Sequence, residues 1–148
     1  MNAALDRLAQ DAGLDRDPRL RLAFGLACVE RVQHLLEEPR AIALLDTLRT
    51  AVRAGTGVAD EVAQEAADLA RGHRGSASLD GSGHSAVSAT HALAKALAGH
   101  ALEAADYAAY AAVYAYGRYA VNDPTSFEPE FAWQAQCLRG LLQQRQHT

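Results

Sequence analysis

The chain is poor in several features that mark common classes of protein. It has a single lysine, Lys95, and its fourteen basic residues are outnumbered by eighteen acidic ones, giving a net charge of −4. This balance argues against a nucleic-acid partner held through its phosphates. β-Branched residues are scarce and no segment alternates apolar and polar residues. The sequence therefore predicts no β-sheet.

Cysteine is also scarce, and long apolar runs are absent. Cys28 and Cys137 lie far apart without CxxC spacing. This is typical of reduced, buried thiols in a cytoplasmic protein, and a disulfide between them stays open. The first ten residues carry early charges and predict no signal peptide. We expect no membrane span, because the alanine-rich segment 86–115 contains four interrupting residues: Lys95, His100, Glu103 and Asp106.

What the chain does have is alanine and helical periodicity. Alanine is the best helix former, and its small side chain lets helices approach closely. We predict an all-α fold: a single-domain bundle of about six helices over residues 1–148. The expected helices cover about 5–12, 17–38, 39–55, 56–71, 84–121 with a break or bend near Gly99, and 126–142. Residues 72–83 are rich in glycine and serine and predict a flexible loop, and 143–148 predict a frayed tail.

Several helix ends and core positions follow from local signals. Asp17 before Pro18 is a helix start, Gly55 is a helix stop, and Thr56 and Ser126 are candidate caps. Apolar residues at helical spacing predict a core that includes Leu22, Leu26, Val29, Leu45, Leu48, Val52, Leu138 and Leu142.

The most informative segment is 99–119, an alanine-rich helix that holds all five tyrosines. Five of its residues alternate steps of three and four and share one helix face. We call this set the tyrosine stripe: His100, Glu103, Tyr107, Tyr110 and Tyr114. Such a stripe suits a helix–helix seam or a surface that packs on a partner and also recognises polar groups. The stripe and Asp106 are our candidate partner-binding residues.

Motifs for chemistry are weak by comparison. Glu30 and His34 share one helix face and His100 and Glu103 another, but the Glu-x-x-His pattern of di-iron bundles is absent. No P-loop or GxSxG motif occurs. We therefore predict no metal and no cofactor, and name no catalytic residue.

Four segments together resemble one known family: LACVERVQHLLEE (26–38), PRAIALLDTLRTAVRAG (39–55), GHALEAADYAAYAA (99–112) and FAWQAQCLRGLL (131–142). Their order resembles the immunity-protein-five-like group of bacterial polymorphic toxin systems. The chain departs from that pattern at Ala96, where the family often has a second histidine. The resemblance implies a small cytoplasmic antidote that binds and neutralises a cognate toxin protein.

The expected function is therefore that of a toxin-binding immunity protein. Two other hypotheses stay open. One is a small helical enzyme or ligand-binding bundle with a site lined by His, Glu and Tyr. The other is a homodimeric scaffold in which the tyrosine stripe is a subunit seam.

Overall fold

The computed structural model describes residues 2–73 and 82–146, and every regular element in these ranges is a helix. The α-helices are α1 (Ala3–Ala12), α2 (Pro18–Arg31), α3 (Pro39–Ala54), α4 (Asp60–Gly72), α5 (Ser82–Leu97), α6 (Ala101–Tyr116) and α7 (Glu128–Gln146). Short 3₁₀ helices lie at η1 (Leu14–Arg16), η2 (Gln33–Leu35), η3 (Arg118–Asn122) and η4 (Pro124–Phe127). The all-α prediction is confirmed, with seven α-helices in these ranges instead of about six.

The helix count differs because Gly99 divides the long helical region expected over 84–121. Gly99 has φ +81°, in the left-handed region that glycine adopts without strain. The His100 N–H then donates to the Lys95 carbonyl at 2.9 Å, which closes the end of α5. α6 starts at Ala101, so the chain reverses within three residues.

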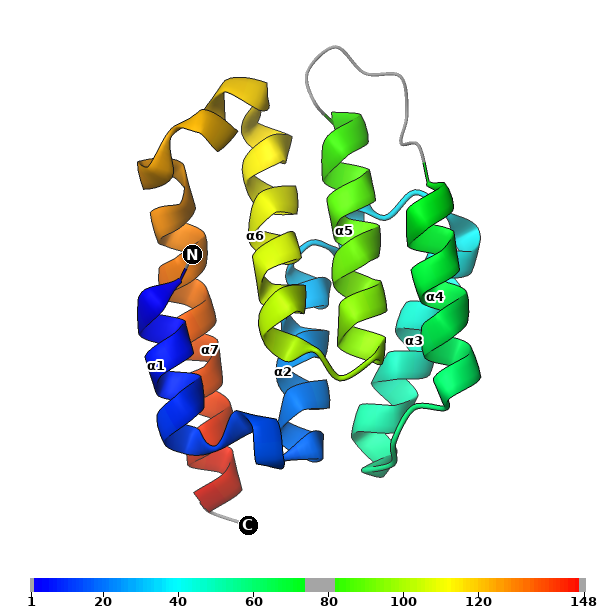
Figure 1. Ribbon diagram of the computed structural model, residues 1–148, viewed down its shortest axis with the longest axis vertical. Coiled ribbons are helices and arrows are strands. Elements are labelled where there is room, and N and C mark those ends of the chain that lie inside the picture. Colours follow the sequence, from blue (N-terminus) through cyan, green and yellow to red (C-terminus); the bar gives the residue numbers. More distant parts are fainter. Residues whose placement is uncertain (1, 74–81, 147–148) are drawn as a thin grey trace.

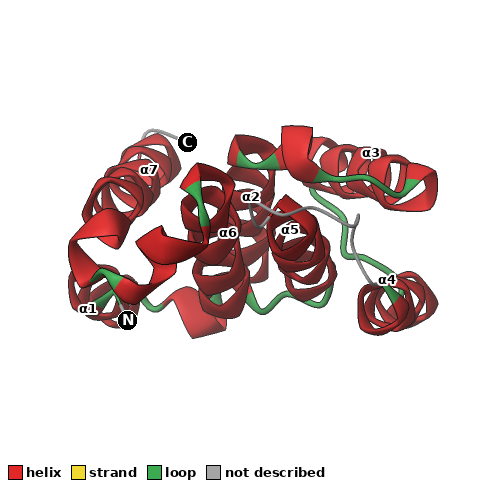
Figure 2. Ribbon diagram, turned by 90° about the horizontal axis from the view of Figure 1, so that it is seen from above, coloured by secondary structure: helices red, strands yellow, loops and turns green. Residues whose placement is uncertain are grey.

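The helices form two layers (Figures 1 and 2). α1, α6, α5 and α4 make the layer nearer the viewer in Figure 1, and α7, α2 and α3 make the layer behind it. Successive α-helices run in opposite directions. α6 packs along α5, α2 packs behind both, and α1 packs against α7. The first and last helices therefore lie side by side.

Small residues allow the two layers to approach closely. Gly25 of α2 faces Ala96 of α5, and a Cβ placed on Gly25 would lie only 3.1 Å from the Ala96 Cβ. Alanines of α5 and α6 fill much of the core between the layers. Of the eight predicted core residues, Leu22, Val29, Leu45, Leu48 and Leu138 are buried. Leu26, Val52 and Leu142 are only partly buried and pack against the edge of the core.

Two helix-end signals act as predicted. The Asp17 carboxylate accepts from the Leu20 N–H at 3.0 Å, with Pro18 in the first helical position. Gly55 ends α3 with φ +70°.

Several predicted boundaries were wrong, including the helical region expected to reach Val121, which ends as α6 at Tyr116. α2 ends at Arg31, not near Glu38, since the chain becomes extended at Leu36 and at Glu38, the residue before Pro39. Thr56 does not cap α4: its N–H donates to the Ala51 carbonyl as part of the α3 terminus, and α4 begins at Asp60. Ser126 lies within η4, and α7 begins at Glu128.

Two further sequence expectations concern the least regular segments. Most of the predicted 72–83 loop, residues 74–81, lies outside the described residues. α7 continues to Gln146, so it includes most of the expected tail over 143–148. Within the described ranges, no helix is both long enough and apolar enough to cross a membrane.

Candidate functional site

The tyrosine stripe lies on α6, whose other faces are made almost entirely of alanine. Ala104, Ala105, Ala108 and Ala111 are each at most 4% exposed. These small side chains hold α6 close to α2 and α5. The larger rings are left along the edge of the α5–α6 seam, where each meets a different environment.

Two of the stripe's tyrosines stack on histidines of α5. The Tyr107 ring lies 5.0 Å from the His91 ring with an interplanar angle of 18°. Tyr114 lies 5.3 Å from His84 with an angle of 26°. Both tyrosines are partly buried. They therefore join α5 and α6 and present only part of each ring to solvent.

Tyr110 differs from these two because no α5 ring covers it. It is 45% exposed. Its ring meets Phe127 edge-on at 5.2 Å and lies 6.3 Å from Tyr114. Phe127 in turn lies 5.6 Å from Phe131 of α7. Tyr110 therefore packs on a small aromatic cluster, while nearly half of its surface stays exposed to solvent.

A charged group stands at the other end of the stripe. The Glu103 carboxylate is 2.9 Å from the Lys95 ammonium and 3.5 Å from His100 Nδ1. Its hydrogen bond with Lys95 lowers the pKa of Glu103. All three side chains are more than a third exposed, so this group is a solvated surface network.

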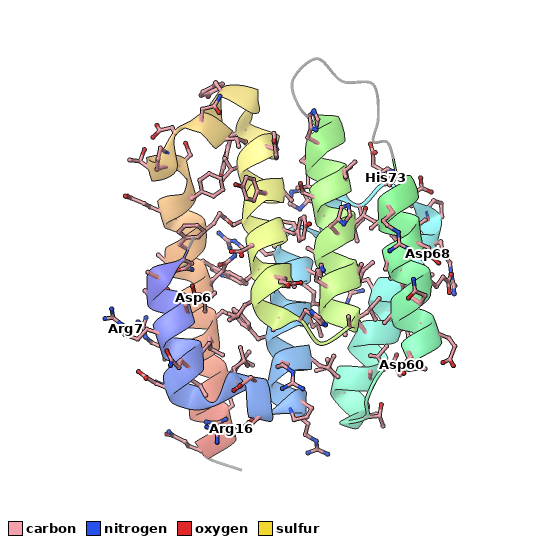
Figure 3. The ribbon with its side chains drawn as sticks, in the orientation of Figure 1. Asp6, Arg7, Arg16, Asp60, Asp68 and His73 are labelled. Atoms are coloured by element: carbon pink, nitrogen blue, oxygen red, sulfur yellow. The ribbon has the colours of Figure 1, made fainter. Side chains whose placement is uncertain are left out.

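Asp106 lies between Glu103 and the tyrosines and has a different electrostatic environment. Partial desolvation by the side chains around it raises the pKa of Asp106, although the residue stays exposed to solvent. The nearby carboxylates of Asp6 and Glu103 raise this pKa further. Asp6 belongs to α1 (Figure 3). Asp106 therefore lies near one carboxylate of α1 and one of α6, and the latter is paired with Lys95.

A shallow hollow of about 400 Å³ unites most of these groups. It is lined by Lys95, Glu103, Asp106, Tyr107 and Tyr110. The structure thus brings four of the six candidate partner-binding residues to one depression. The other two do not line the depression: His100 contacts Glu103, and the Tyr114 ring lies next to Tyr110.

Exposure alone does not single out Tyr110. Tyr116 and Tyr119 are 71% and 77% exposed, and both lie outside the predicted stripe. They sit at the end of α6 and in η3, and neither lines the hollow. Tyr110 is distinguished by its neighbours, because an apolar ring beside carboxylates offers both contact area and charge.

The two His and Glu pairs considered for metal binding do not form a cluster. Glu30 accepts a hydrogen bond from Arg49 Nε of α3 at 2.8 Å. Within residues 2–73 and 82–146, no group of three or more His, Cys, Asp or Glu side chains is arranged to hold a metal ion. Cys28 and Cys137 are both free thiols, and burial raises the pKa of each.

Sequence reasoning missed a buried polar network around α7. Arg31 of α2 forms a bidentate pair with Glu130 at 2.8 and 3.1 Å, and its guanidinium lies 4.5 Å from the Trp133 ring centroid. Gln134 donates to the Ala105 carbonyl of α6 at 2.8 Å and accepts from Asn2 at 3.3 Å. The sequence offered one indication of this network, since Glu130 and Gln134 interrupt the apolar residues of FEPEFAWQA (127–135). Their partners are distant in the sequence, so the pattern does not identify them.

Comparison of the chain with family profiles, with curated proteins and with solved structures finds no match. The resemblance to immunity-protein-five-like proteins thus stays an expectation from the sequence. The fold and the hollow on α6 define the chain as an all-helical protein with an acidic, tyrosine-containing surface.

Proposed function

We propose that this protein binds another protein through the surface around Tyr110, Glu103 and Asp106, and that it acts as an immunity protein against a bacterial toxin domain. The observation that carries the proposal is Tyr110, an open aromatic ring with carboxylates around the same hollow. Tyrosine at an interface supplies a large contact area at low entropic cost.

The charge around Tyr110 indicates which partners suit it. Asp6 and Glu103 both act on Asp106, and the whole chain carries a net charge of −4. A negative surface steers a basic partner toward itself and repels an acidic one. Toxins that act on nucleic acids are usually basic, so the surface fits the function that the resemblance implies.

A neighbouring hollow favours a second candidate function, the binding of a small molecule. It measures about 380 Å³ and lies between α1, η1 and the start of α6. Its polar lining comes from Asp6, Gln10, Asp15, Arg21, His100 and Glu103. This arrangement supports the ligand-binding hypothesis. Glu103 lines both hollows, whereas His100 lines only this one.

Co-purification with the products of the neighbouring genes tests the immunity proposal. Tagged protein should retain one neighbouring toxin domain, and co-expression should restore growth of cells that the toxin otherwise arrests. Mass measurement of the free protein shows whether it is a monomer that can offer this surface. The proposal fails if no neighbouring product binds, or if a small metabolite co-purifies and His100→Ala removes it.

A further inference from the structure

The rear layer contains a groove that the surface around Tyr110 does not use. It measures about 620 Å³ and lies where the start of α2 meets the ends of α3 and α7. These three helices form the layer behind α5 and α6, with α3 and α7 on either side of α2 (Figure 2). The groove is therefore on a different part of the molecule from the hollow on α6.

The floor of this groove is apolar. Leu20 and Leu22 are buried at 6% and 8% exposure and contribute their outer atoms to it. Ala23, Val52 and Leu141 are partly buried and also line it. Val52, one of the predicted core residues, is therefore incompletely covered here. A partner that supplies apolar side chains would gain by covering this floor.

Arginines form much of the polar lining. Arg19, Arg53 and Arg145 line the groove, against one carboxylate, Asp17. Arg145 pairs with Asp17 at 2.9 Å. Neither Arg19 nor Arg53 lies within ion-pair distance of any carboxylate in the described residues, whereas Arg31, Arg40 and Arg49 all do.

The Arg19 side chain lies against Gly55 at the end of α3. Its guanidinium lies over Gly55, with Nη2 only 2.6 Å from where a Cβ would be. This places the charge at the C-terminal end of α3, which the helix dipole makes negative. Glycine at position 55 thus serves both to end α3 and to make room for the Arg19 side chain.

We propose that this groove binds an acidic amphipathic helix of a partner protein. Apolar side chains of such a helix would cover the floor, and its carboxylates would pair with Arg19 and Arg53. Charge complementarity selects this occupant, because the groove lining is positive on a chain that is negative overall. The inference goes beyond the proposed function and concerns a separate surface.

Fluorescence anisotropy with two synthetic helical peptides tests the proposal. Both carry leucine at alternating third and fourth positions; one has glutamate at the remaining positions and the other has lysine. The groove should bind the acidic peptide, and substitutions at Arg19 and Arg53 should not weaken any binding of the basic peptide elsewhere on the protein. Arg19→Glu combined with Arg53→Glu should weaken binding by about tenfold or more.

A matched charge reversal controls for the loss of net positive charge. Arg7→Glu with Arg16→Glu changes the charge equally, and both residues are exposed and outside the groove (Figure 3). This variant and Tyr110→Ala should bind the acidic peptide as the wild type does. Arg53→Glu alone, at an exposed position, should weaken binding less than the double variant. Circular dichroism checks that both variants are folded, and the single variant keeps the test valid if the double variant is not.

Three results would overturn the proposal. One is binding of the acidic peptide that Arg19→Glu with Arg53→Glu leaves unchanged, and another is an equal loss of binding in the Arg7 and Arg16 control. The third is a concentration-dependent dimer in sedimentation that Arg53→Glu dissociates, which would assign the groove to a second copy of this chain.

Discussion

α6 is attached to its neighbours in two different ways. Toward α5, Tyr107 and Tyr114 stack on histidines at the rim of the seam, where the rings stay partly exposed. Toward α7, the contact is a buried hydrogen bond. The side-chain amide of Gln134, which is 2% exposed, donates to a backbone carbonyl of α6. The buried contact can serve only the fold, whereas the half-open seam can serve both the fold and a partner.

The buried amide and the exposed rings differ in how much free energy is lost when a contact is removed. A buried amide that loses its partner is left unsatisfied, and that costs free energy of unfolding. A ring at a solvent-exposed edge loses only part of its contact area when its neighbour is removed. Mutations on the α7 side should therefore change stability, and mutations around Tyr110 should change binding.

The largest effect is expected for Leu138→Ala in α7. Leu138 is fully buried, so truncation leaves a cavity and should lower the free energy of unfolding by about 2–5 kcal/mol. Leu142→Ala, one turn later at a partly buried position, should cost clearly less. Urea unfolding monitored by circular dichroism measures both. Equal losses would mean that the α7 core is not where the structure places it.

A smaller loss is expected for Gln134→Ala, which tests the buried amide directly. It removes the hydrogen bond to Ala105 and leaves Asn2 without one of its acceptors. The free energy of unfolding should fall by about 1–3 kcal/mol. Gln136→Ala is a matched control at an exposed position of the same helix and should change little. A neutral Gln134→Ala would remove the contrast between the two sides of α6.

The α5–α6 seam should respond differently at each tyrosine. Tyr107→Ala removes a partly buried stacked ring and should cost about 1–2 kcal/mol of unfolding free energy. Tyr110→Ala should cost less than about 1 kcal/mol, because nearly half of its surface is already in water. Thermal unfolding of the two variants compares them. If Tyr110→Ala is the more damaging, Tyr110 belongs to the core and the binding surface must lie elsewhere.

The smallest effect concerns pH and His91. Burial, with help from Lys95, His73 and Arg71, lowers the pKa of His91 below its ordinary value of 6.5. The unfolded chain therefore binds a proton more readily, and stability should fall as the pH drops through 6.5 toward the folded-state pKa. His91→Gln should flatten the pH dependence of the unfolding midpoint in this window. An unchanged slope would show that His91 does not titrate differently on folding.

Local signals in the sequence predicted much of the fold. The all-α class, the start at Asp17 and Pro18, and the stop at Gly55 depend on residues close in the chain. The helix boundaries that failed depend on tertiary context. Thr56 could have capped a new helix, but its N–H closes the end of α3 and α4 begins only at Asp60.

The candidate site was predictable as a helix face but not in its division of roles. The spacing of Tyr107, Tyr110 and Tyr114 places them together on α6, as the structure shows. Which of them stacks on a histidine depends on the register between α5 and α6, and no local pattern encodes that register. The same limit applies to Glu130, whose partner Arg31 lies 99 residues away in the sequence.

A second surface with exposed carboxylates lies on α4. Asp60, Glu61, Glu65 and Asp68 are all exposed on that helix, at the far edge of the molecule from α1 (Figure 3). Glu65 pairs with Arg40 and Asp68 with Arg71, so part of this charge is already neutralised. Glu103 in the hollow on α6 is paired too, with Lys95. It is therefore the exposed ring of Tyr110, and not the charge, that favours the α6 hollow for recognition.

The most direct test of the central claim is the affinity of Tyr110→Ala and Tyr116→Ala for the protein partner that co-purification identifies, measured by isothermal titration calorimetry. Both are exposed tyrosines of α6, but only Tyr110 lines the acidic hollow. The account predicts a loss of about 1–3 kcal/mol in binding free energy for Tyr110→Ala and no measurable change for Tyr116→Ala. Equal losses in both variants, or full binding by Tyr110→Ala, would contradict it.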